Sequence, residues 1–524
     1  MPRSLVLLLL LLLGPWPGAA QELRIGMKAA VDGSDPHQSY SPNRNVQLHV
    51  YEPLVFQDLH LRPVPGLATA WRAPDAESWE FTLREGVRFH DGTPLTPADV
   101  AFSIRRAREA TGLRTYAPLV RAVTAVEVVD ARTVRIRTRA PAPMLPSALA
   151  SIGIVSAAAV GEAGEAEFNG GRAAIGTGPY RWVRFNHGAS VVLDRAAAHW
   201  GAAREPWERV TYRFIPNDSA RVAALLAGDV DVIDAVPATL YARVQEDERT
   251  RLITDTAAFN FYIFLDSFRD RPLHATRLDS QPLEANPMRD ARVRRAISHA
   301  LNRPALAERA MQGGATPSNQ IAPAGYIGHD PELPPVAYDP ALARRLLAEA
   351  GYPQGFALTI HCTGDRFPGD ARSCQAIGQM LTTIGIRTAV ETLPAAIFFR
   401  RANGGANGEP EFTASANMFA STTGVAAEGM TSILRTPNPT LGHGASNRGR
   451  YSDPVLDGML TRIEATFDDA AREALMREAA RRAMAEQGVV PVFYVKSAWG
   501  LQRGLTLVPR GDQYTMATGI RPAP

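Results

Sequence analysis

The fold of this chain is decided by one stretch, Trp79-Glu-Phe-Thr-Leu-Arg-Glu-Gly-Val-Arg-Phe-His-Asp-Gly-Thr-Pro-Leu-Thr-Pro-Ala-Asp-Val-Ala-Phe-Ser103. Apolar and polar residues alternate from position 79 to position 83, which is typical of a half-buried strand. Residues 90–94 supply the glycine and the proline of a tight turn. Thr96 is a strong helix N-cap and Pro97 suits the first helical position. The stretch therefore predicts a strand, a turn and a helix in succession.

The same stretch resembles a known family signature. The pattern F-x-L-R-x-G-V-x-F-H-D-G-x-P-x-T-A-x-D-V-x-F-S recurs in the family 5 extracytoplasmic solute-binding proteins of ABC importers, and nearly every fixed position is filled here. That family serves peptides, nickel and some sugars. Gly176-Thr-Gly-Pro-Tyr180 and the segment from Asn286 to Asn302 are also similar to family elements. In the family the signature marks scaffold, so it identifies relatives without naming the cargo.

The resemblance implies an α/β, two-lobed periplasmic-binding-protein fold of the class II type, with an extra subdomain in the first lobe. We expect lobe I over residues 21–262, with the inserted subdomain at about 60–175. Lobe II is expected over residues 263–490, and residues 491–524 return to lobe I. Residues 218–236 independently predict a capped helix followed by a short apolar strand, the alternation of an α/β sheet.

The N-terminus predicts export. Residues 1–20 contain a basic Arg3, an apolar run and small residues before a cleavage point between Ala20 and Gln21. The apolar run from Leu5 to Leu13 is too short to span a bilayer, which needs about 20 residues. No cysteine lies near the cleavage point, so no lipid anchor is expected. We therefore expect a signal peptide and a periplasmic protein that is not lipid-anchored.

Composition limits the partners and the covalent chemistry. The net charge of +3 is too small to indicate nucleic acid as a partner, and we expect a monomer. Lysine occurs only at Lys28 and Lys496, a bias toward arginine that we attribute to coding composition. The only cysteines, Cys362 and Cys374, predict one disulfide in an oxidising compartment.

Four candidate ligand contacts come from the resemblance to the family. Residues after its D-P-H turn line the ligand cleft, which favours Tyr40 and Asn43. For Asn43, a role as a helix cap has equal weight. The aromatic run at 259–266 resembles the strand that crosses between the lobes and contributes ligand contacts. Phe261 and Ile263 share one face of that strand, and only one of its two faces can form the site.

The segment from residue 412 to residue 441 departs from the family. Peptide-binding branches carry Trp-x-x-Asp here, whose aspartate holds the ammonium of the peptide. The aligned positions are Phe419 and Thr422, and the segment contains neither tryptophan nor aspartate. Either another acid such as Glu428 holds the ammonium, or the cargo is not a peptide with a free amine. We expect neutral hydrogen-bond partners instead, with an ordinary polar loop as the alternative; the candidates are Asn417, Phe419, Ser421, Thr422 and Thr423.

The function implied by the resemblance is delivery of a peptide or peptide-like solute to an ABC permease and ATPase complex at the inner membrane, through hinge closure. Nickel, a metal chelate or an opine-like solute is the alternative cargo, and His443 lies near the place of a histidine in nickel-binding relatives. A secreted hydrolase or a receptor-docking sensor are alternative functions. The sequence lacks the G-x-S-x-G, H-E-x-x-H and P-loop motifs, so we expect neither an enzyme nor a cofactor.

Overall fold

The computed structural model describes residues 22–38, 41–111, 115–201, 204–421 and 423–524. The predicted signal peptide and its cleavage point lie outside these residues. Within them, no helix has both the length and the apolar character needed to cross a membrane.

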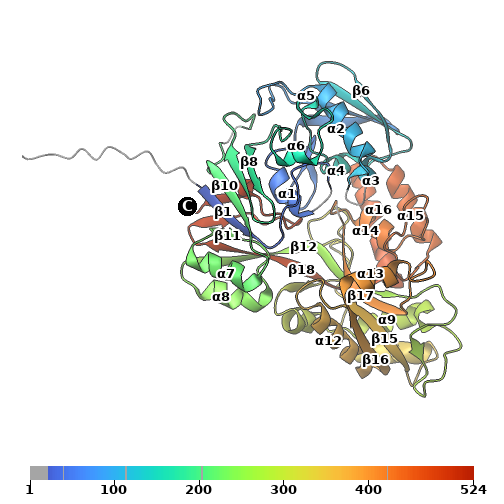
Figure 1. The fold of residues 1–524 in the computed structure, drawn as a ribbon. Helices are drawn as coiled ribbons and strands as arrows, with labels where there is room; N and C mark the ends of the chain where they lie inside the picture. Colours follow the sequence, from blue (N-terminus) through green and yellow to red (C-terminus); the bar gives the residue numbers. More distant parts are fainter. Residues whose placement is uncertain (1–21, 39–40, 112–114, 202–203, 422) are drawn as a thin grey trace, which may run out of the picture.

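One sheet of twelve strands runs through both lobes (Figure 1). Its main path has the order β13-β15-β17-β12-β18-β11-β1-β10-β9-β8, while β14 pairs with β18 and β16 with β15. The two longest strands, β12 (Thr250–Leu265) and β18 (Val490–Gln502), are antiparallel neighbours and belong to both lobes. All other strands of this sheet belong to a single lobe. The lobes are therefore joined through a pair of hydrogen-bonded strands.

Lobe I contains the β11 to β8 end of this sheet. Strand β1 lies between β10 and β11 and is parallel to both. The strands are β1 (Glu22–Met27), β8 (Tyr180–Asn186), β9 (Ser190–Arg195), β10 (Arg209–Phe214) and β11 (Val232–Ile233). The helices are α1 (Ser41–Gln47), α7 (Asp218–Ala227), η1 (Ala238–Leu240) and α8 (Tyr241–Glu246). The C-terminal segment adds β19 (Leu505–Leu507), η4 (Ala517–Gly519) and β20 (Ile520–Pro522).

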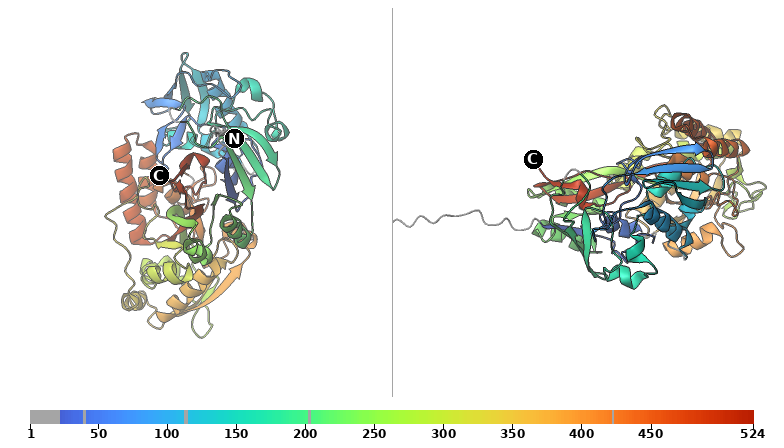
Figure 2. Two further views of the ribbon diagram at one scale, coloured as in Figure 1. Left: turned by 90° about the vertical axis from the view of Figure 1, so that its left-hand side faces the viewer. Right: turned by 90° about the horizontal axis from the view of Figure 1, so that it is seen from above.

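A subdomain with its own hydrophobic core extends lobe I. Its four-stranded sheet has the order β4-β5-β7-β6, and a separate hairpin pairs β2 with β3. The strands are β2 (Val55–Gln57), β3 (Pro63–Pro65), β4 (Ala68–Asp75), β5 (Ser78–Leu83), β6 (Val123–Val128) and β7 (Thr133–Thr138). The helices are α2 (Pro97–Glu109), α3 (Ala117–Val120) and α4 (Leu145–Leu149). Helices α5 (Ala157–Val160) and α6 (Glu165–Asn169) follow, and their buried Val160 and Phe168 pack in the core of lobe I. In Figure 2 (left) the subdomain lies at the opposite end of the molecule from the yellow and orange elements of lobe II.

Lobe II contains the other end of the large sheet, with strands β13 (Ala275–Thr276), β14 (Ala315–Pro317), β15 (Phe356–Thr363), β16 (Ile386–Leu393) and β17 (Ala414–Ala420). Its first helices are η2 (Pro287–Arg289), α9 (Ala291–His299), α10 (Arg303–Ala305), η3 (Leu306–Ala310), α11 (Pro340–Glu349) and α12 (Asp370–Thr383). The remaining helices are α13 (Ala395–Asn403), α14 (Ala426–Ile433), α15 (Pro454–Ala465) and α16 (Asp469–Glu486). The predicted disulfide is confirmed, because Cys362 of β15 is bonded to Cys374 of α12.

The strand, turn and helix predicted from residue 79 onward are confirmed as β5 and α2. The start of α2 is secured by Asp99, whose carboxylate accepts hydrogen bonds from the amide and the hydroxyl of Thr96 at 2.9 and 2.7 Å. The other carboxylate oxygen of Asp99 accepts from the amide of Ala157 at 2.9 Å, which ties α2 to α5. The signature thus acts as scaffold inside the subdomain.

The two glycine-rich turns of the sequence contact each other. The imidazole Nε2 of His90, in the signature, bonds to the carbonyl of Gly178 at 2.8 Å. On the other side, the amides of Gly178 and Tyr180 donate to the carbonyls of Val50 and His49, at 3.0 Å each. A Cβ on Gly178 would lie 2.2 Å from the His49 carbonyl oxygen, so this close approach requires glycine.

These contacts correct one sequence prediction. The apolar spacing of Val46, Val50 and Leu54 predicts one continuous helix, but α1 ends at Gln47. The carbonyls of His49 and Val50 accept hydrogen bonds from residues 178 and 180 instead of from the next turn of a helix. Long-range pairing therefore replaces the local helix here.

Candidate ligand-binding cleft

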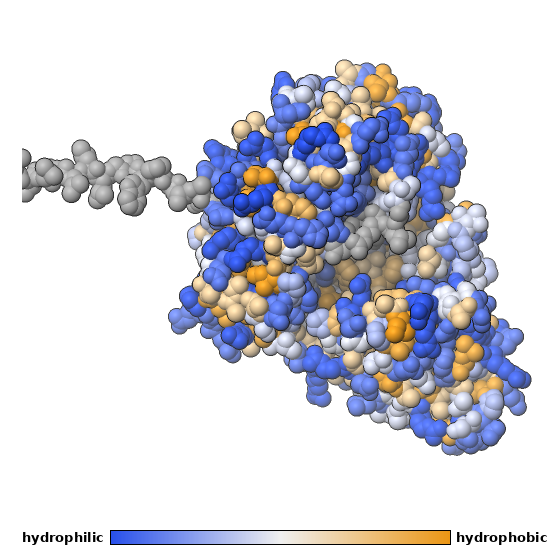
Figure 3. Space-filling view, in the orientation of Figure 1, coloured by the Kyte–Doolittle hydropathy of each residue, from blue (hydrophilic) through white to orange (hydrophobic). Residues whose placement is uncertain are grey.

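The interlobe cleft lies where β12 and β18 pass from one lobe into the other. Two adjoining cavities of about 370 Å³ each open there, and Phe259, Asp512 and Tyr514 line both. The first cavity is lined by residues that follow β1 and β11 in lobe I and by residues that precede β14 and α12 in lobe II. The second reaches the subdomain at Tyr116 and lobe II at Ser421. Figure 3 shows the surface hollowed between the lobes.

An irregularity in the crossing strands shapes the cleft. The β12–β18 register runs to the pair Thr256–Lys496 and resumes at the pair Asn260–Tyr494. Three residues of β12 therefore oppose a single residue of β18, which is a bulge with two extra residues. A bulge bends a strand and redirects a side chain. Here the half-buried Phe259, inside the bulge, lines both cavities.

Basic side chains from both lobes line the first cavity: Lys28, Lys496, Arg366 and Arg372. Lys28 directly follows β1, and its Nζ lies 3.2 Å from Asp218 Oδ1. Lys496 is half-buried on β18 beside the bulge. Arg372, on α12, donates to Gln312 at 3.5 Å.

The two carboxylates of the first cavity already have cationic partners. Asp512 forms an ion pair with Arg510, with 2.6 Å between Nη2 and Oδ2. Asp234 accepts a hydrogen bond from the amide of Lys28 at 2.7 Å and lies 3.7 Å from Arg221 Nε. Burial raises the pKa of Asp234 to about 6, against the opposing effect of Arg221. The positive charges of the cavity are therefore not neutralised by its own acids.

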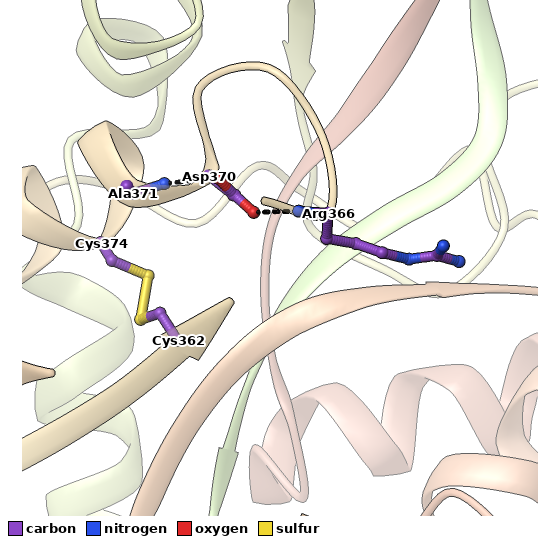
Figure 4. The surroundings of a disulfide bond; sticks show 5 residues. All are labelled: Cys362, Arg366, Asp370, Ala371 and Cys374. Atoms are coloured by element: carbon purple, nitrogen blue, oxygen red, sulfur yellow. Dashed lines mark hydrogen bonds between the residues drawn. A yellow bond between two sulfur atoms is a disulfide. The ribbon is translucent and has the colours of Figure 1, made fainter. Parts of the chain in front are cut away.

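The disulfide positions the loop that carries Arg366. Cys362 lies in β15, before the loop, and Cys374 lies in α12, after it. Within the loop, the amide of Arg366 donates to the Asp370 carboxylate at 2.9 Å. Figure 4 shows the Arg366 side chain directed away from both Asp370 and the disulfide. The backbone of the loop is thus fixed at two points while the guanidinium lines the cleft.

Three predicted contacts lie beneath the surface of the cleft. Asn43 is fully buried and exchanges two hydrogen bonds with Asp32, at 2.7 and 2.9 Å. Phe261 is fully buried and stacks on Phe493, with 5.1 Å between the ring centroids. Ile263 is fully buried in the same hydrophobic core of lobe II. As ligand contacts these residues stay predictions, and in this conformation each has a structural partner.

The polar segment after residue 416 is partly at the cleft. Asn417 is fully buried, and neither atom of its amide group has a hydrogen-bond partner among the described residues. Phe419 packs against the hydrophobic cluster beneath α14 to α16. Ser421 lines the second cavity and donates to Glu428 at 2.7 Å, and the Thr423 amide donates to the same carboxylate oxygen at 2.8 Å. Tyr40 and Thr422 lie outside the described residues.

His443 lies elsewhere. It is half-buried in a turn with Asn438, and burial lowers its pKa. Across the residues that the structure describes, no three His, Cys, Asp or Glu side chains are grouped in a way that could hold a metal ion.

The cleft contains residues that the sequence did not single out, chiefly Lys28, Phe259, Arg366, Lys496 and Tyr514. The signal for the two lysines was present, since they are the only lysines of the chain. Phe259 belonged to the aromatic run of the crossing strand. For Arg366 and Tyr514 the sequence offers no comparable signal, because only the folded topology brings their loops to the cleft.

Comparison with known proteins identifies proteins that are similar to this chain. Residues 62–431 match the profile of the bacterial extracellular solute-binding proteins, family 5 (middle region). The glutathione-binding protein GsiB of Escherichia coli O1:K1 is 26% identical over 496 residues, which cover 93% of this chain and 92% of GsiB.

Solved structures agree with this match. The unliganded open form of MppA, a periplasmic murein tripeptide binding protein, has a TM-score of 0.80 at 22% identity, covering 96% of this chain and 97% of that one. DppA from Helicobacter pylori, in complex with the peptide STSA, has a TM-score of 0.71 at 20% identity, covering 96% and 98%. The predicted two-lobed periplasmic-binding-protein fold is confirmed.

Proposed function

Because the chain belongs to the bacterial extracellular solute-binding proteins of family 5, we propose that it carries a peptide or peptide-like solute to the permease and ATPase of an ABC importer. It does so in the periplasm as a monomer, after removal of a signal peptide at residues 1–20. The carrier binds its solute without altering it.

The observation that carries this proposal is a cleft lined from both lobes at the strands that join them. A solute that contacts both lobes stabilises the conformation in which the lobes are close together. The proposed hinge is the bulge at residues 257–259. The proposed lobe bounds stay those expected from the family resemblance: 21–262 and 491–524 for lobe I, and 263–490 for lobe II. The higher TM-score to an unliganded open form, 0.80 against 0.71 for a peptide complex, supports an open conformation here.

A small peptide is the cargo that the relatives favour. GsiB is named for glutathione and MppA for a murein tripeptide. Ser421 lines the second cavity, and its neighbours Asn417, Phe419 and Thr423 are the proposed contacts that meet the solute after closure. Tyr40 and Thr422, which lie outside the described residues, remain contacts expected from the sequence. Asn43, Phe261 and Ile263 remain expected contacts that are fully buried in this conformation.

The test is a thermal-shift screen of the purified mature protein, together with mass spectrometry of any solute released on denaturation. The panel contains glutathione, di- to pentapeptides, opine-like amines and nickel-histidine. A cognate solute at 100 times its Kd adds about 2.7 kcal/mol to the free energy of unfolding, which raises Tm. An unchanged Tm with every peptide of the panel would refute the peptide assignment, and a shift with nickel-histidine or an opine alone would replace it.

A variant locates the binding. Thr239→Trp places a large side chain on the wall of the first cavity, where Thr239 is exposed, and we expect it to abolish the shift. Thr392→Trp is the matched control on β16, and the shift should persist. If the solute raises the Tm of both variants equally, the binding site lies outside the cleft.

A further inference from the structure

The lysines of this chain lie together in the folded structure. It contains two lysines, and the other 54 basic side chains are arginines. Both lysines line the first cavity of the interlobe cleft. Coding composition explains why arginine dominates, but it does not explain why the two exceptions meet in one cavity although they are 468 positions apart in sequence. Lysine presents a compact ammonium with three donors on a flexible stem, whereas arginine presents a planar fork.

Within the described part of the chain, neither Lys496 nor Arg366 forms an ion pair with an acid. Among the described residues, no carboxylate lies within ion-pair distance of the Lys496 ammonium or of the Arg366 guanidinium. The acids of the same cavity, Asp234 and Asp512, are paired with Arg221 and Arg510. Lys28 forms an ion pair with Asp218, and 41% of the Lys28 side-chain surface stays exposed to solvent.

The two unpaired cations line the cleft from different parts of the molecule. Lys496 lies on β18 beside the bulge, and Arg366 lies on the disulfide-bounded loop of lobe II. Lobe closure over a neutral solute would remove both cations from water without a partner, which is costly. Closure over a solute with correctly spaced carboxylates would instead form charge-assisted hydrogen bonds, which are about twice as strong as neutral ones. The same charges thus favour an acid and disfavour its neutral analogue.

On the premise that the chain is a peptide-like solute carrier, we infer that its cargo is a small acid with at least two carboxylates. Lys496, with Lys28 beside it, binds one carboxylate at the hinge. Arg366 binds another carboxylate from lobe II as the cleft closes. This arrangement also fits the absence of an aspartate at position 422, because the site recognises the negative charge of the solute and not an ammonium group.

The test is calorimetric titration with acid and amide pairs of equal size: Glu-Glu against Gln-Gln, Ala-Glu against Ala-Gln, and glutathione against the analogue in which its glycine carboxylate is a carboxamide. We expect the preferred acid to bind about tenfold to hundredfold more tightly than its neutral partner. Lys496→Gln and Arg366→Gln should each weaken the acid by a similar factor and change the neutral partner by less than threefold. Arg345→Gln, an exposed arginine on α11, is the matched control and should change neither.

The outcomes separate the two proposals. If neutral peptides bind as tightly as their acidic partners, or if both cleft variants keep the selectivity of the wild type, the inference about acids is wrong while the carrier function stands. If no member of the panel binds the wild type, the peptide-carrier function itself is contradicted. Circular dichroism and Tm of each variant exclude loss of folding as the cause of lost binding.

Discussion

His49 shows how a single buried side chain makes the fold sensitive to acid. It is fully buried, and its Nε2 accepts a hydrogen bond from the amide of Ala517 at 2.9 Å, so the ring is neutral. Burial lowers its pKa from 6.5 to about 4. Below pH 6.5 the unfolded chain therefore binds a proton that the folded chain does not bind until about pH 4. The stability present above pH 6.5 is lost as the pH falls through this window.

We expect the His49→Gln variant to lose less stability on acidification than the wild type. Between pH 6.5 and pH 4 the difference is about 3 kcal/mol in the free energy of unfolding. Urea denaturation across this pH range measures it. His187→Gln is the control, because His187 is exposed, and its pH dependence should match that of the wild type. Parallel pH profiles for all three proteins would contradict this, because they would mean that His49 takes up its proton at the same pH in the folded and the unfolded chain.

The sequence predicts the contacts of some single residues but not of others. The disulfide followed from a count, since Cys362 and Cys374 are the only cysteines. Phe261 was placed on the correct strand, but alternation alone does not tell which face meets the core. Its stacking on Phe493 pairs residues that are far apart in the chain, and no local pattern contains that information.

At the scale of elements, the disulfide links β15 to α12 and closes a short loop. Its cysteines are 12 positions apart, and loop-closure entropy gives about 3 kcal/mol for a loop of this length. We expect the double variant Cys362→Ala/Cys374→Ala to lose about 3 kcal/mol in urea denaturation. Wild type treated with a reductant should approach the variant, and the variant itself should not respond to reductant. A variant as stable as the oxidised wild type would contradict this entropic role.

Elements were predictable where their signals are local. The N-caps and glycine stops around α7 and α11, and the signature at β5 and α2, place helices and strands close to their observed bounds. Strand β11 is only two residues long, although residues 230–236 form an apolar run. Its extent is set by its partners β1 and β18, which the sequence of the run does not contain.

At the scale of the whole molecule, the order of the large sheet joins the two lobes through the hydrogen-bonded strands β12 and β18. Strands β12 and β18 are hydrogen-bonded on both sides of the bulge, and their register shifts twice, between Thr256 and Asn260 and between Phe261 and Tyr262. Because a bulge bends a strand, this segment is where we propose that the connection bends. The family resemblance predicted two lobes and a strand that crosses between them. It did not predict the bulge, because extra residues become visible only when both strands are paired.

If that bulge is the hinge, a bound acid should make the protein more compact. A chain of this length has a radius of gyration of about 24 Å when compact, and closure of one lobe on the other should lower the measured value by about 1 Å. Small-angle X-ray scattering with and without the tightest acidic peptide measures the change. Its amide partner at equal concentration and Arg366→Gln with the acid should both leave the radius near the unliganded value, because neither supplies the charge pair across the cleft. A radius that is unchanged although calorimetry shows the acid bound would mean that the solute is held by one lobe alone, and the crossing strands would then be a rigid connection between the lobes.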